Sequence, residues 1–345
     1  MPITLLLLIG AVFLFRLFRF RFMWGTAQQR SLLAAYYDAD LVLSCGGGNF
    51  YAHRPLSPAF IWALLSLAFA LALRKPVAML PQSFGPVAGF AQQMLARWTF
   101  SRVRLIMVRE SRAGSFLREV LRVKTPIVLL PDMAFELSVG VANERVIGPA
   151  SQRQIGVTAI DRGAQDPNFG GQLGYEEALC VLLTRLARER HARIHVFCQC
   201  FGPSSDQDDR PVARRLYQQL RQNGLDATLH IEFRDAVEII TAYSQLDMIV
   251  GTRMHTGIFA LSSGVPVLLI GYQPKACGMM TALGFERYCC DIKDANANVL
   301  FELASEILAH EHELRVQIAE RVREVRLQSN AWLDYVRRVL CHASE

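Results

Sequence analysis

The sequence predicts an α/β fold of two Rossmann-like domains with parallel sheets, and a ligand site in the cleft between them. Short apolar runs alternate with amphipathic stretches along most of the chain, which is typical of βα units. The alternation stops at a polar stretch at 138–153 and then restarts, which indicates a linker. The 345 residues also suffice for two separate cores.

We therefore expect an N-terminal domain at 1–145, a C-terminal domain at 151–300 and a charged helical tail at 301–345. The first half has expected strands at 39–45, 76–80, 105–108 and 127–130, and helices at 60–73 and 112–121. The second half has expected strands at 155–159, 193–198, 228–231, 248–250 and 266–270, and helices at 175–191, 211–223, 236–244 and 256–262. Because ligands of open α/β sheets bind beyond the carboxyl ends of strands, the turns that follow these strands are the candidate site.

The composition excludes several classes of protein. With 52% hydrophobic and 20% charged residues, the chain is neither disordered, nor a coiled coil, nor collagen-like. The net charge of +6 is spread along the chain, mostly on predicted helix faces, with no dense basic run that would indicate a nucleic-acid partner. Neither GxGxxG nor GxxxxGK[ST] occurs, which argues against nicotinamide cofactors and P-loop nucleotide hydrolysis.

The eight cysteines form no CxxC pair and no zinc spacing, so we expect reduced thiols in a cytosolic protein and no metal site. Cys198 and Cys200 are expected on one face of a strand, as core side chains. The acidic residues at 206–209 have weak metal potential and are interpreted as a solvated loop.

The amino terminus carries an apolar run at 4–15, followed by Arg16, Arg19 and Arg21. Twelve residues are fewer than the ~20 that cross a bilayer, and no small-residue cleavage site follows. We interpret residues 4–24 as a buried or membrane-surface segment, with a short anchor as the alternative.

Arg253 and His255 are the strongest candidates for chemistry. They follow a buried strand and precede a helix, where backbone N–H groups and the helix dipole favour an anion. The arginine supplies a fixed cation and the histidine a titratable proton carrier, although a capping arginine and a structural histidine would show the same spacing. Lys275 and Tyr272 follow the next strand, and together these residues predict a phosphate- or carboxylate-bearing substrate.

Glycines and polar side chains also follow the strands of the first half. The candidates for binding there are Gly47, Gly48, Asn49, Gln82, Ser83, Arg109 and Glu110. The glycines permit close approach of the backbone, and the polar side chains suit sugar hydroxyls or anions; plain turns and an Arg109–Glu110 ion pair are the alternatives. Asp132 is a candidate general base, or a cap of the following turn.

Taken in order, these segments resemble the polysaccharide pyruvyl transferase family across residues 39–285. The matching stretches are ADLVLSCGGGNF (39–50), PQSFGP (81–86), VRESRAGSFL (108–117), PDMAF (131–135), IGVTA (155–159), CQCFGP with DQDDR (198–210), GTRMHTGIFALSSGVPVLLIGYQPKACG (251–278) and ALG (282–284). The resemblance implies a GT-B-like fold and transfer of pyruvate from phosphoenolpyruvate to two hydroxyls of a saccharide, without a cofactor. It also implies that Arg253 and His255 serve in donor binding and catalysis.

We hypothesise that His255 protonates the enol carbon, that Arg253 and Lys275 hold the anion, and that Asp132 or Glu110 orients the acceptor. The enzyme would be cytoplasmic, either free or held at the inner face of the membrane through residues 4–24, with an acceptor that is free or lipid-linked. It would act in exopolysaccharide or cell-surface polysaccharide biosynthesis.

Two features depart from the family pattern. Family members usually begin with a further βα unit, so the first sheet is expected to be incomplete here. Many relatives also place an arginine soon after the strand at 155–159, a role left here to Arg162. The alternatives are a nucleotide-sugar glycosyltransferase, and an inactive scaffold of a polysaccharide assembly complex.

Overall fold

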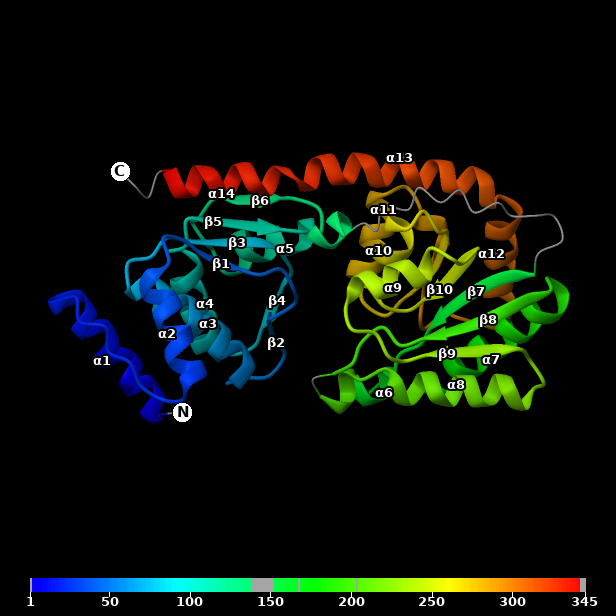
Figure 1. Ribbon diagram of the computed structural model, residues 1–345, viewed down its shortest axis with the longest axis horizontal. Coiled ribbons are helices and arrows are strands. Elements are labelled where there is room, and N and C mark those ends of the chain that lie inside the picture. The colour runs from blue at the N-terminus through cyan, green and yellow to red at the C-terminus, as the bar shows by residue number, and fades with distance from the viewer. Residues whose placement is uncertain (1, 138–151, 167, 203, 342–345) are drawn as a thin grey trace. The chain divides into compact units, whose positions relative to one another are not determined.

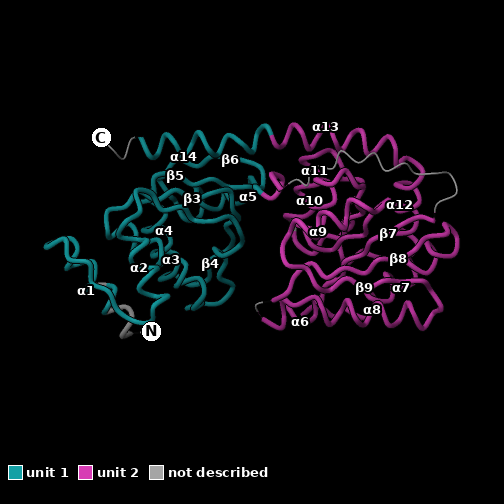
Figure 2. The backbone as a smooth tube through the Cα atoms, in the orientation of Figure 1, with its two compact units in different colours: residues 1–133, 327–345 teal, residues 134–326 magenta. Residues whose placement is uncertain are grey.

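Two compact units make up the computed structural model, which describes residues 2–137, 152–166, 168–202 and 204–341 (Figure 2). Unit 1 comprises residues 1–133 and 327–345, and unit 2 comprises residues 134–326. Both are α/β units with parallel sheets, which confirms the predicted fold class. Residues 301–345, expected as a separate tail, are divided between the units, and residues 138–151 of the expected linker lie outside the described part of the chain.

Unit 1 contains a four-stranded parallel sheet with the order β1-β3-β5-β6 (Figure 1). The strands are β1 (Val42–Ser44), β3 (Val77–Gln82), β5 (Leu105–Val108) and β6 (Ile127–Leu129), close to the four expected ranges. The helices are α1 (Pro2–Phe18), α2 (Ala27–Asp38), α3 (Pro58–Ala72), α4 (Phe90–Phe100), α5 (Ser111–Ser115) and α14 (Ala331–Cys341), with a single helical turn at Phe116–Val120. A further turn at Met133–Glu136 begins at the last residue of this segment and belongs mostly to unit 2.

All six residues of β3 are buried, and alternate side chains enter two different cores. Val77 and Met79 pack in a cluster with side chains of α3 and α4. Ala78 and Leu80 pack in a second cluster, to which α14 contributes Trp332 and its neighbours. Because side chains alternate across a strand, a strand buried on both faces needs a covering layer on each. Helix α14 supplies the second layer, so it is an integral part of unit 1.

A second, two-stranded parallel sheet joins β2 (Phe50–Ala52) and β4 (Phe84–Val87). The interpretation of residues 81–86 as a turn is therefore wrong, because β3 continues to Gln82 and β4 begins at Phe84. Gln82 and Ser83 are fully buried, and the Ser83 N–H donates to the carbonyl of Gly47 at 3.0 Å. Polar residues in a Gly- and Pro-containing segment suggested a turn, but backbone pairing buries them.

Unit 2 contains a six-stranded parallel sheet with the order β12-β11-β10-β7-β8-β9. Its strands are β7 (Arg153–Thr158), β8 (Ala192–Phe197), β9 (Ala227–His230), β10 (Met248–Gly251), β11 (Val267–Gly271) and β12 (Cys289–Asp291). Its helices are α6 (Arg162–Gln165), α7 (Gln172–Glu189), α8 (Arg210–Gln222), α9 (Ala236–Tyr243), α10 (Met254–Ser262), α11 (Pro274–Ala282), α12 (Ala297–Ala309) and α13 (Glu311–Ser329), the last ending beyond the unit. The five strands expected here are confirmed, and β12 is an additional edge strand.

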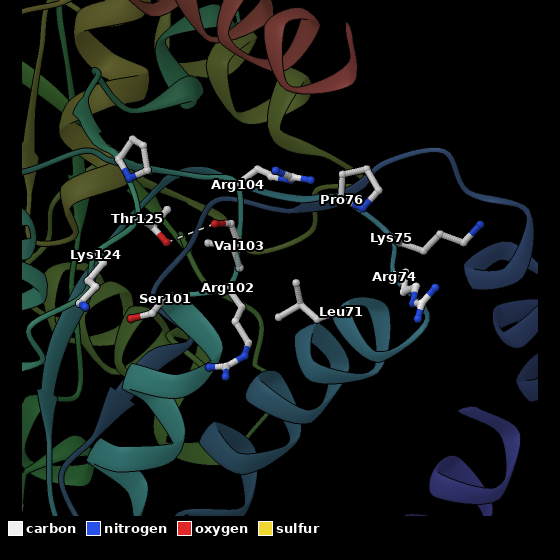
Figure 3. Close-up of a pocket in the computed structure, with 11 residues that line it drawn as sticks. Leu71, Arg74, Lys75, Pro76, Ser101, Arg102, Val103, Arg104, Lys124 and Thr125 are labelled. Carbon is white, nitrogen blue, oxygen red and sulfur yellow. Dashed lines mark hydrogen bonds between the residues drawn. The ribbon is translucent and has the colours of Figure 1, made fainter. Parts of the chain in front are cut away.

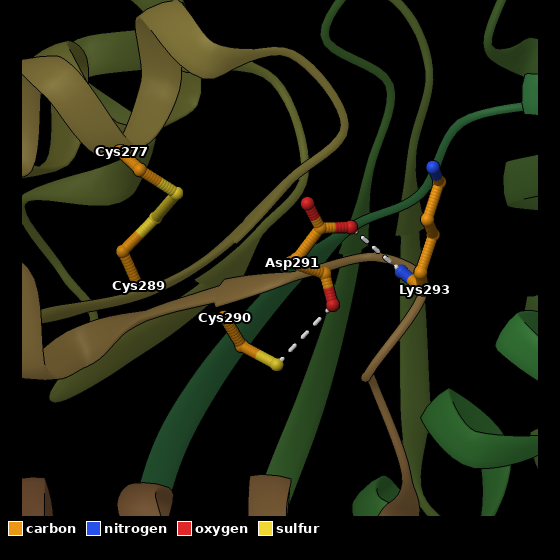
Figure 4. The surroundings of a disulfide bond; sticks show 5 residues. All are labelled: Cys277, Cys289, Cys290, Asp291 and Lys293. Carbon is orange, nitrogen blue, oxygen red and sulfur yellow. Dashed lines mark hydrogen bonds between the residues drawn. A yellow bond between two sulfur atoms is a disulfide. The ribbon is translucent and has the colours of Figure 1, made fainter.

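A disulfide joins Cys277 on α11 to Cys289 in β12, with the Cα atoms 5.7 Å apart (Figure 4). The prediction that all eight cysteines are reduced is wrong for this pair. A Cβ on Gly271, at the end of β11, would lie 2.9 Å from the Cys277 sulfur, so the glycine leaves room for the bridge. The two cysteines are 12 positions apart and meet only because β11 pairs with β12.

The apolar amino terminus forms α1, whose inner face packs on α2 and α3. Ala11 and Phe15 are buried in a cluster with Tyr37 and Leu73, and the Tyr37 hydroxyl donates to the carbonyl of Phe22 at 3.1 Å. Within the described part of the chain, no helix has both the length and the apolar character needed to cross a membrane.

Candidate functional site

Two helices of unit 2 begin at the carboxyl ends of adjacent strands. Helix α10 follows β10, and α11 follows β11; the strands pair in parallel, with Gly251 opposite Leu269. Arg253 is the N-cap of α10, His255 lies in its first turn, and Lys275 lies in the first turn of α11. Each helix start carries roughly half a positive charge, so this edge of the sheet attracts anions.

Arg253 forms a bidentate ion pair with Asp209. Its Nε and Nη2 atoms donate to the two carboxylate oxygens at 2.6 Å each, and the two side chains are only 15% and 2% exposed. Burial acts to lower the pKa of Arg253, but the hydrogen bonds and charge of Asp209 outweigh burial and raise it. The guanidinium is therefore permanently charged. Its Nη1 makes no hydrogen bond to any described residue, which leaves that edge available to a ligand.

Asp209 is the residue that sequence reasoning missed. The interpretation of residues 206–209 as a solvated loop is wrong for this side chain, which also accepts a hydrogen bond from the Cys200 N–H at 3.1 Å. Burial raises the pKa of Asp209 above its ordinary value in spite of the arginine. An aspartate just before a helix is usually a cap, so the sequence carried no signal for a partner 44 positions away.

Tyr272 and Arg162 lie beside this pair. The Arg162 guanidinium carbon is 5.5 Å from the centroid of the Tyr272 ring, and its Nη2 pairs with Asp166 at 2.8 Å. Burial raises the pKa of the Tyr272 hydroxyl, while Arg253 acts to lower it. Two of the predicted cations are thus neutralised by carboxylates. The positive potential that Arg253 and Arg162 add to the two helix starts at this edge is therefore less than the sequence alone suggested.

Buried hydroxyls fix the start of α10 against the sheet. The Thr252 hydroxyl donates to the carbonyl of Thr158 at 3.1 Å and lies 2.5 Å from the Tyr175 hydroxyl. The Thr256 hydroxyl lies 3.1 Å from that of Thr158 and donates to the Gln199 side chain at 3.2 Å. A buried network in which every hydroxyl is hydrogen-bonded is rigid, because any other arrangement would leave a polar group unpaired. This network therefore fixes the backbone on both sides of Arg253. The half-buried His255 ring lies 6.1 Å from that of Phe259.

Cys198 and Cys200 follow the end of β8 and do not lie on a strand face as predicted. Burial, followed by the charges of Asp209 and Asp208, raises the pKa of Cys198 to about 12. Its thiol is therefore protonated and unreactive at neutral pH.

The candidates of unit 1 also gather at the carboxyl ends of its strands. Arg109 Nε donates to the Ser83 hydroxyl at 2.7 Å, and Nη1 donates to Asp132 at 2.5 Å. Arg109 and Asp132 side chains are 5% and 12% exposed. The Arg109–Glu110 ion pair that the sequence left open is absent among the described contacts. Glu110 instead accepts a hydrogen bond from the Tyr51 hydroxyl at 3.4 Å, and burial raises the pKa of that hydroxyl.

Gln82 has an unsatisfied acceptor at this edge. Its Nε2 donates to the Ser44 hydroxyl at 3.4 Å, whereas its buried Oε1 accepts nothing from the described residues. A buried carbonyl without a donor is costly, so a ligand hydroxyl would be well placed there. Gly47, with φ of 152°, adopts a conformation that favours glycine, and Gly48 and Asn49 next to it are exposed.

Gly85 brings β4 against the Tyr51 ring. A Cβ at this position would lie 1.7 Å from the ring, whereas a Cβ on Gly48 would meet nothing within 4 Å. We expect Gly85→Ala to push Tyr51 away from Glu110 and lower the free energy of unfolding by about 1–3 kcal/mol, as overpacking does. Gly48→Ala should change it by less than about 0.5 kcal/mol. Urea unfolding measures both, and equal effects would contradict the close approach.

The structure thus gathers the candidates into two groups, one on each unit, while the cleft between the halves stays a prediction. Asp132, Arg109, Glu110, Gln82 and Ser83 share the edge of the unit 1 sheet. In the described ranges no three His, Cys, Asp or Glu side chains form a group that could hold a metal ion.

Several known proteins are similar to this chain. Amylovoran biosynthesis protein AmsJ of Erwinia amylovora is 26% identical over 305 residues, which cover 85% of this chain and 71% of AmsJ. A putative UDP-N-acetylglucosamine 2-epimerase from Listeria monocytogenes has a TM-score of 0.59 at 13% identity, covering 92% of this chain and 81% of its own. Sucrose-phosphate synthase from Thermosynechococcus elongatus has a TM-score of 0.56 at 15% identity, covering 91% and 77%. These two structures share the fold of two Rossmann-like domains.

The family model described as polysaccharide pyruvyl transferase matches residues 8–274. The match begins within α1, earlier than the motifs that start at residue 39, and it includes Arg253 and His255. It covers well over half of the chain, and therefore this chain belongs to the polysaccharide pyruvyl transferase family.

Proposed function

We propose that the chain transfers pyruvate from phosphoenolpyruvate to two hydroxyl groups of a saccharide during polysaccharide biosynthesis. Membership of the family supports the reaction class, and similarity to an amylovoran biosynthesis protein supports the process. The observation that carries the proposal is the position of Arg253, His255 and Lys275 at the starts of two adjacent helices, α10 and α11.

Unit 2 is the part that we assign to the donor. Phosphoenolpyruvate carries a carboxylate and a phosphate, which suit two helix starts, the Lys275 ammonium and the outer edge of the Arg253 guanidinium. Asp209 holds that guanidinium in one orientation, so its remaining N–H groups are directed without loss of side-chain entropy on binding. Tyr272 adds a hydroxyl beside them.

Unit 1 is the part that we assign to the acceptor. Saccharides are recognised through hydroxyls, which donate and accept at the same atom. The Gln82 carbonyl is a buried acceptor, and Glu110 and Asp132 offer carboxylates for a proton from an attacking hydroxyl. Arg109 fixes Asp132 and Ser83, so these groups present one arrangement to the sugar.

The proposed chemistry balances without a redox partner. His255 protonates the methylene carbon of the enol, and a saccharide oxygen bonds to the central carbon. The bond from that carbon to the phosphate oxygen breaks, and the second hydroxyl closes the ketal. Of the two hydroxyl protons, one replaces the proton that His255 gave to the new methyl group, and the other leaves with phosphate.

Donor binding can be tested by thermal unfolding of the purified full chain. We expect phosphoenolpyruvate at about ten times its Kd to stabilise the protein by about 1.4 kcal/mol, and Lys275→Gln to lose this response. Lys293→Gln, an exposed lysine of the same unit, is the matched control and should respond like the wild type. Stabilisation by a nucleotide sugar alone would indicate a glycosyltransferase, and no response to either ligand would indicate a scaffold.

A further inference from the structure

A pocket of about 590 Å³ lies at the amino edge of the unit 1 sheet (Figure 3). It is bounded by the end of α3 and by the residues just before β5 and β6, so Pro76, Arg104 and Pro126 each line it at the start of a strand. The candidate acceptor residues follow the opposite ends of these strands. Six residues of extended chain separate the two edges by about 20 Å.

The pocket is strongly basic. Figure 3 shows cationic side chains on several sides of it, namely Arg74, Lys75, Arg102, Arg104 and Lys124. No aspartate or glutamate lines the pocket, and none of the five has a carboxylate within salt-bridge distance in the described part of the chain. Helices α3 and α4 end nearby, and their partial negative charges offset only about one of the five positive charges.

Elsewhere in the chain buried arginines are paired, as Arg109 is with Asp132 and Arg253 with Asp209. The cations of the pocket are instead mostly exposed and lie close together without carboxylate partners, which creates a region of positive potential that attracts anions. Arg74 also adopts a left-handed conformation, with φ of 63°, at a helix end where glycine is usual. An arginine thus occupies a position where the backbone conformation favours glycine.

Helix α1 carries exposed apolar side chains on another part of the unit 1 surface. The face of α1 opposite to Phe15 carries Phe13 and Leu17, which are 60% and 61% exposed and help to line a shallow second pocket of about 380 Å³. Helix α1 packs against Leu73, the residue before Arg74, through its Phe15 face, so Phe13 and Leu17 point away from that contact.

Trp98, near the end of α4, is 43% exposed. The Arg102 guanidinium carbon lies 4.3 Å from the centroid of its ring. An exposed tryptophan beside cations is typical of a surface that contacts the polar–apolar boundary of a bilayer.

We propose that the amino edge of unit 1 is a docking surface for a bilayer that contains anionic phospholipids. Phosphate headgroups enter the basic pocket, while Trp98 beside it enters the interface between headgroups and acyl chains. Charge complementarity selects this occupant, because five cations without a carboxylate partner and the adjacent exposed Trp98 match a surface that is anionic outside and apolar within. The sequence indicated a membrane contact only through the apolar terminus. The basic pocket is a different surface, formed by the segments 71–76, 101–104 and 124–126.

Vesicle binding of the full chain tests the proposal. We expect sedimentation with vesicles of phosphatidylcholine and phosphatidylglycerol, and little with phosphatidylcholine alone. The variant R74Q/R104Q/K124Q should lower the partition coefficient on the order of 100-fold, since each basic residue near an anionic surface contributes about a factor of five. These three side chains are exposed and donate no hydrogen bond to the described part of the chain, so the fold should persist.

The matched control R214Q/K293Q/R323Q removes the same charge from exposed positions of unit 2 and should bind vesicles like the wild type. Equal losses in both variants, or equal binding to both kinds of vesicle, would overturn the proposal. So would binding of inorganic pyrophosphate that depends on the three residues without any binding to vesicles, because that result would identify a soluble anion as the ligand.

The membrane proposal is independent of pyruvyl transfer. With a water-soluble acceptor, R74Q/R104Q/K124Q should release phosphate from phosphoenolpyruvate at the wild-type rate. Loss of vesicle binding with full turnover would support the docking surface, whatever the identity of the natural acceptor.

Discussion

Replacing His255 with Asn is expected to lower the rate of phosphate release from phosphoenolpyruvate by about 10²–10⁴-fold, the usual contribution of a general acid. The substitution should leave the fold intact, because His255 is only half-buried in the first turn of α10, where asparagine is well tolerated. Phosphate release in the presence of a saccharide acceptor is the measurement, with the thermal midpoint as the check on folding.

A matched control is His310→Asn, an exposed histidine after α12, which should retain full activity. Near-normal turnover of His255→Asn would overturn the assignment of the acid. Donor binding separates the two possible failures: if phosphoenolpyruvate still raises the midpoint of the inactive variant, His255 acts in the chemical step rather than in binding.

Replacing Asp209 with Ala is expected to lower the free energy of unfolding by about 3–5 kcal/mol, because it leaves a buried guanidinium without its partner. Asp209 is 2% exposed and binds Arg253 through both oxygens. Arg253 should also lose its fixed orientation, so stabilisation by phosphoenolpyruvate should fall in the same variant. Urea unfolding and thermal unfolding with the ligand measure the two effects.

The neighbouring Asp208 provides the control for this prediction. It forms an ion pair with Arg210 at 2.7 Å, but Arg210 is 41% exposed, so Asp208→Ala should cost less than about 1 kcal/mol. The double variant D209A/R253M should recover part of the lost stability, because it removes the uncompensated charge, and it should not recover donor binding. If Asp208→Ala and Asp209→Ala both lower the free energy of unfolding by the same small amount, the interpretation of this segment as a solvated loop would be correct.

Much of the fold was predictable because it depends on local patterns. Apolar runs with breakers located all nine expected strands, and the carboxyl ends of those strands located Arg253, Lys275, Arg109 and Asp132. The strands β2, β4 and β12 were missed. Strands β2 and β4 have only three and four residues, β4 contains Gly85 and Pro86, and only their pairing with each other makes them a sheet.

The carboxylate that pairs with each arginine was not predictable from local patterns. The sequence placed Arg253 at a helix start, but its carboxylate partner is 44 positions away, and it placed Arg109 next to Glu110 although its partner is Asp132. Which acid an arginine meets depends on the strand order and on the loops between strands. Spacing along the chain therefore identified the cations but overestimated the net positive charge that they present.

The βα order, the parallel sheets and the strand ends at which polar side chains gather follow from local patterns in the sequence, because hydrophobic periodicity and turn chemistry act over a few residues. Tertiary structure alone decided the Arg253–Asp209 pair, the disulfide between Cys277 and Cys289, the cover of β3 by α14 and the basic pocket at Arg74, Arg104 and Lys124. Each joins segments that are separate in the chain. Such contacts form only when the sheet sets its strand order, since burial and charge compensation depend on distance in space rather than on distance in sequence.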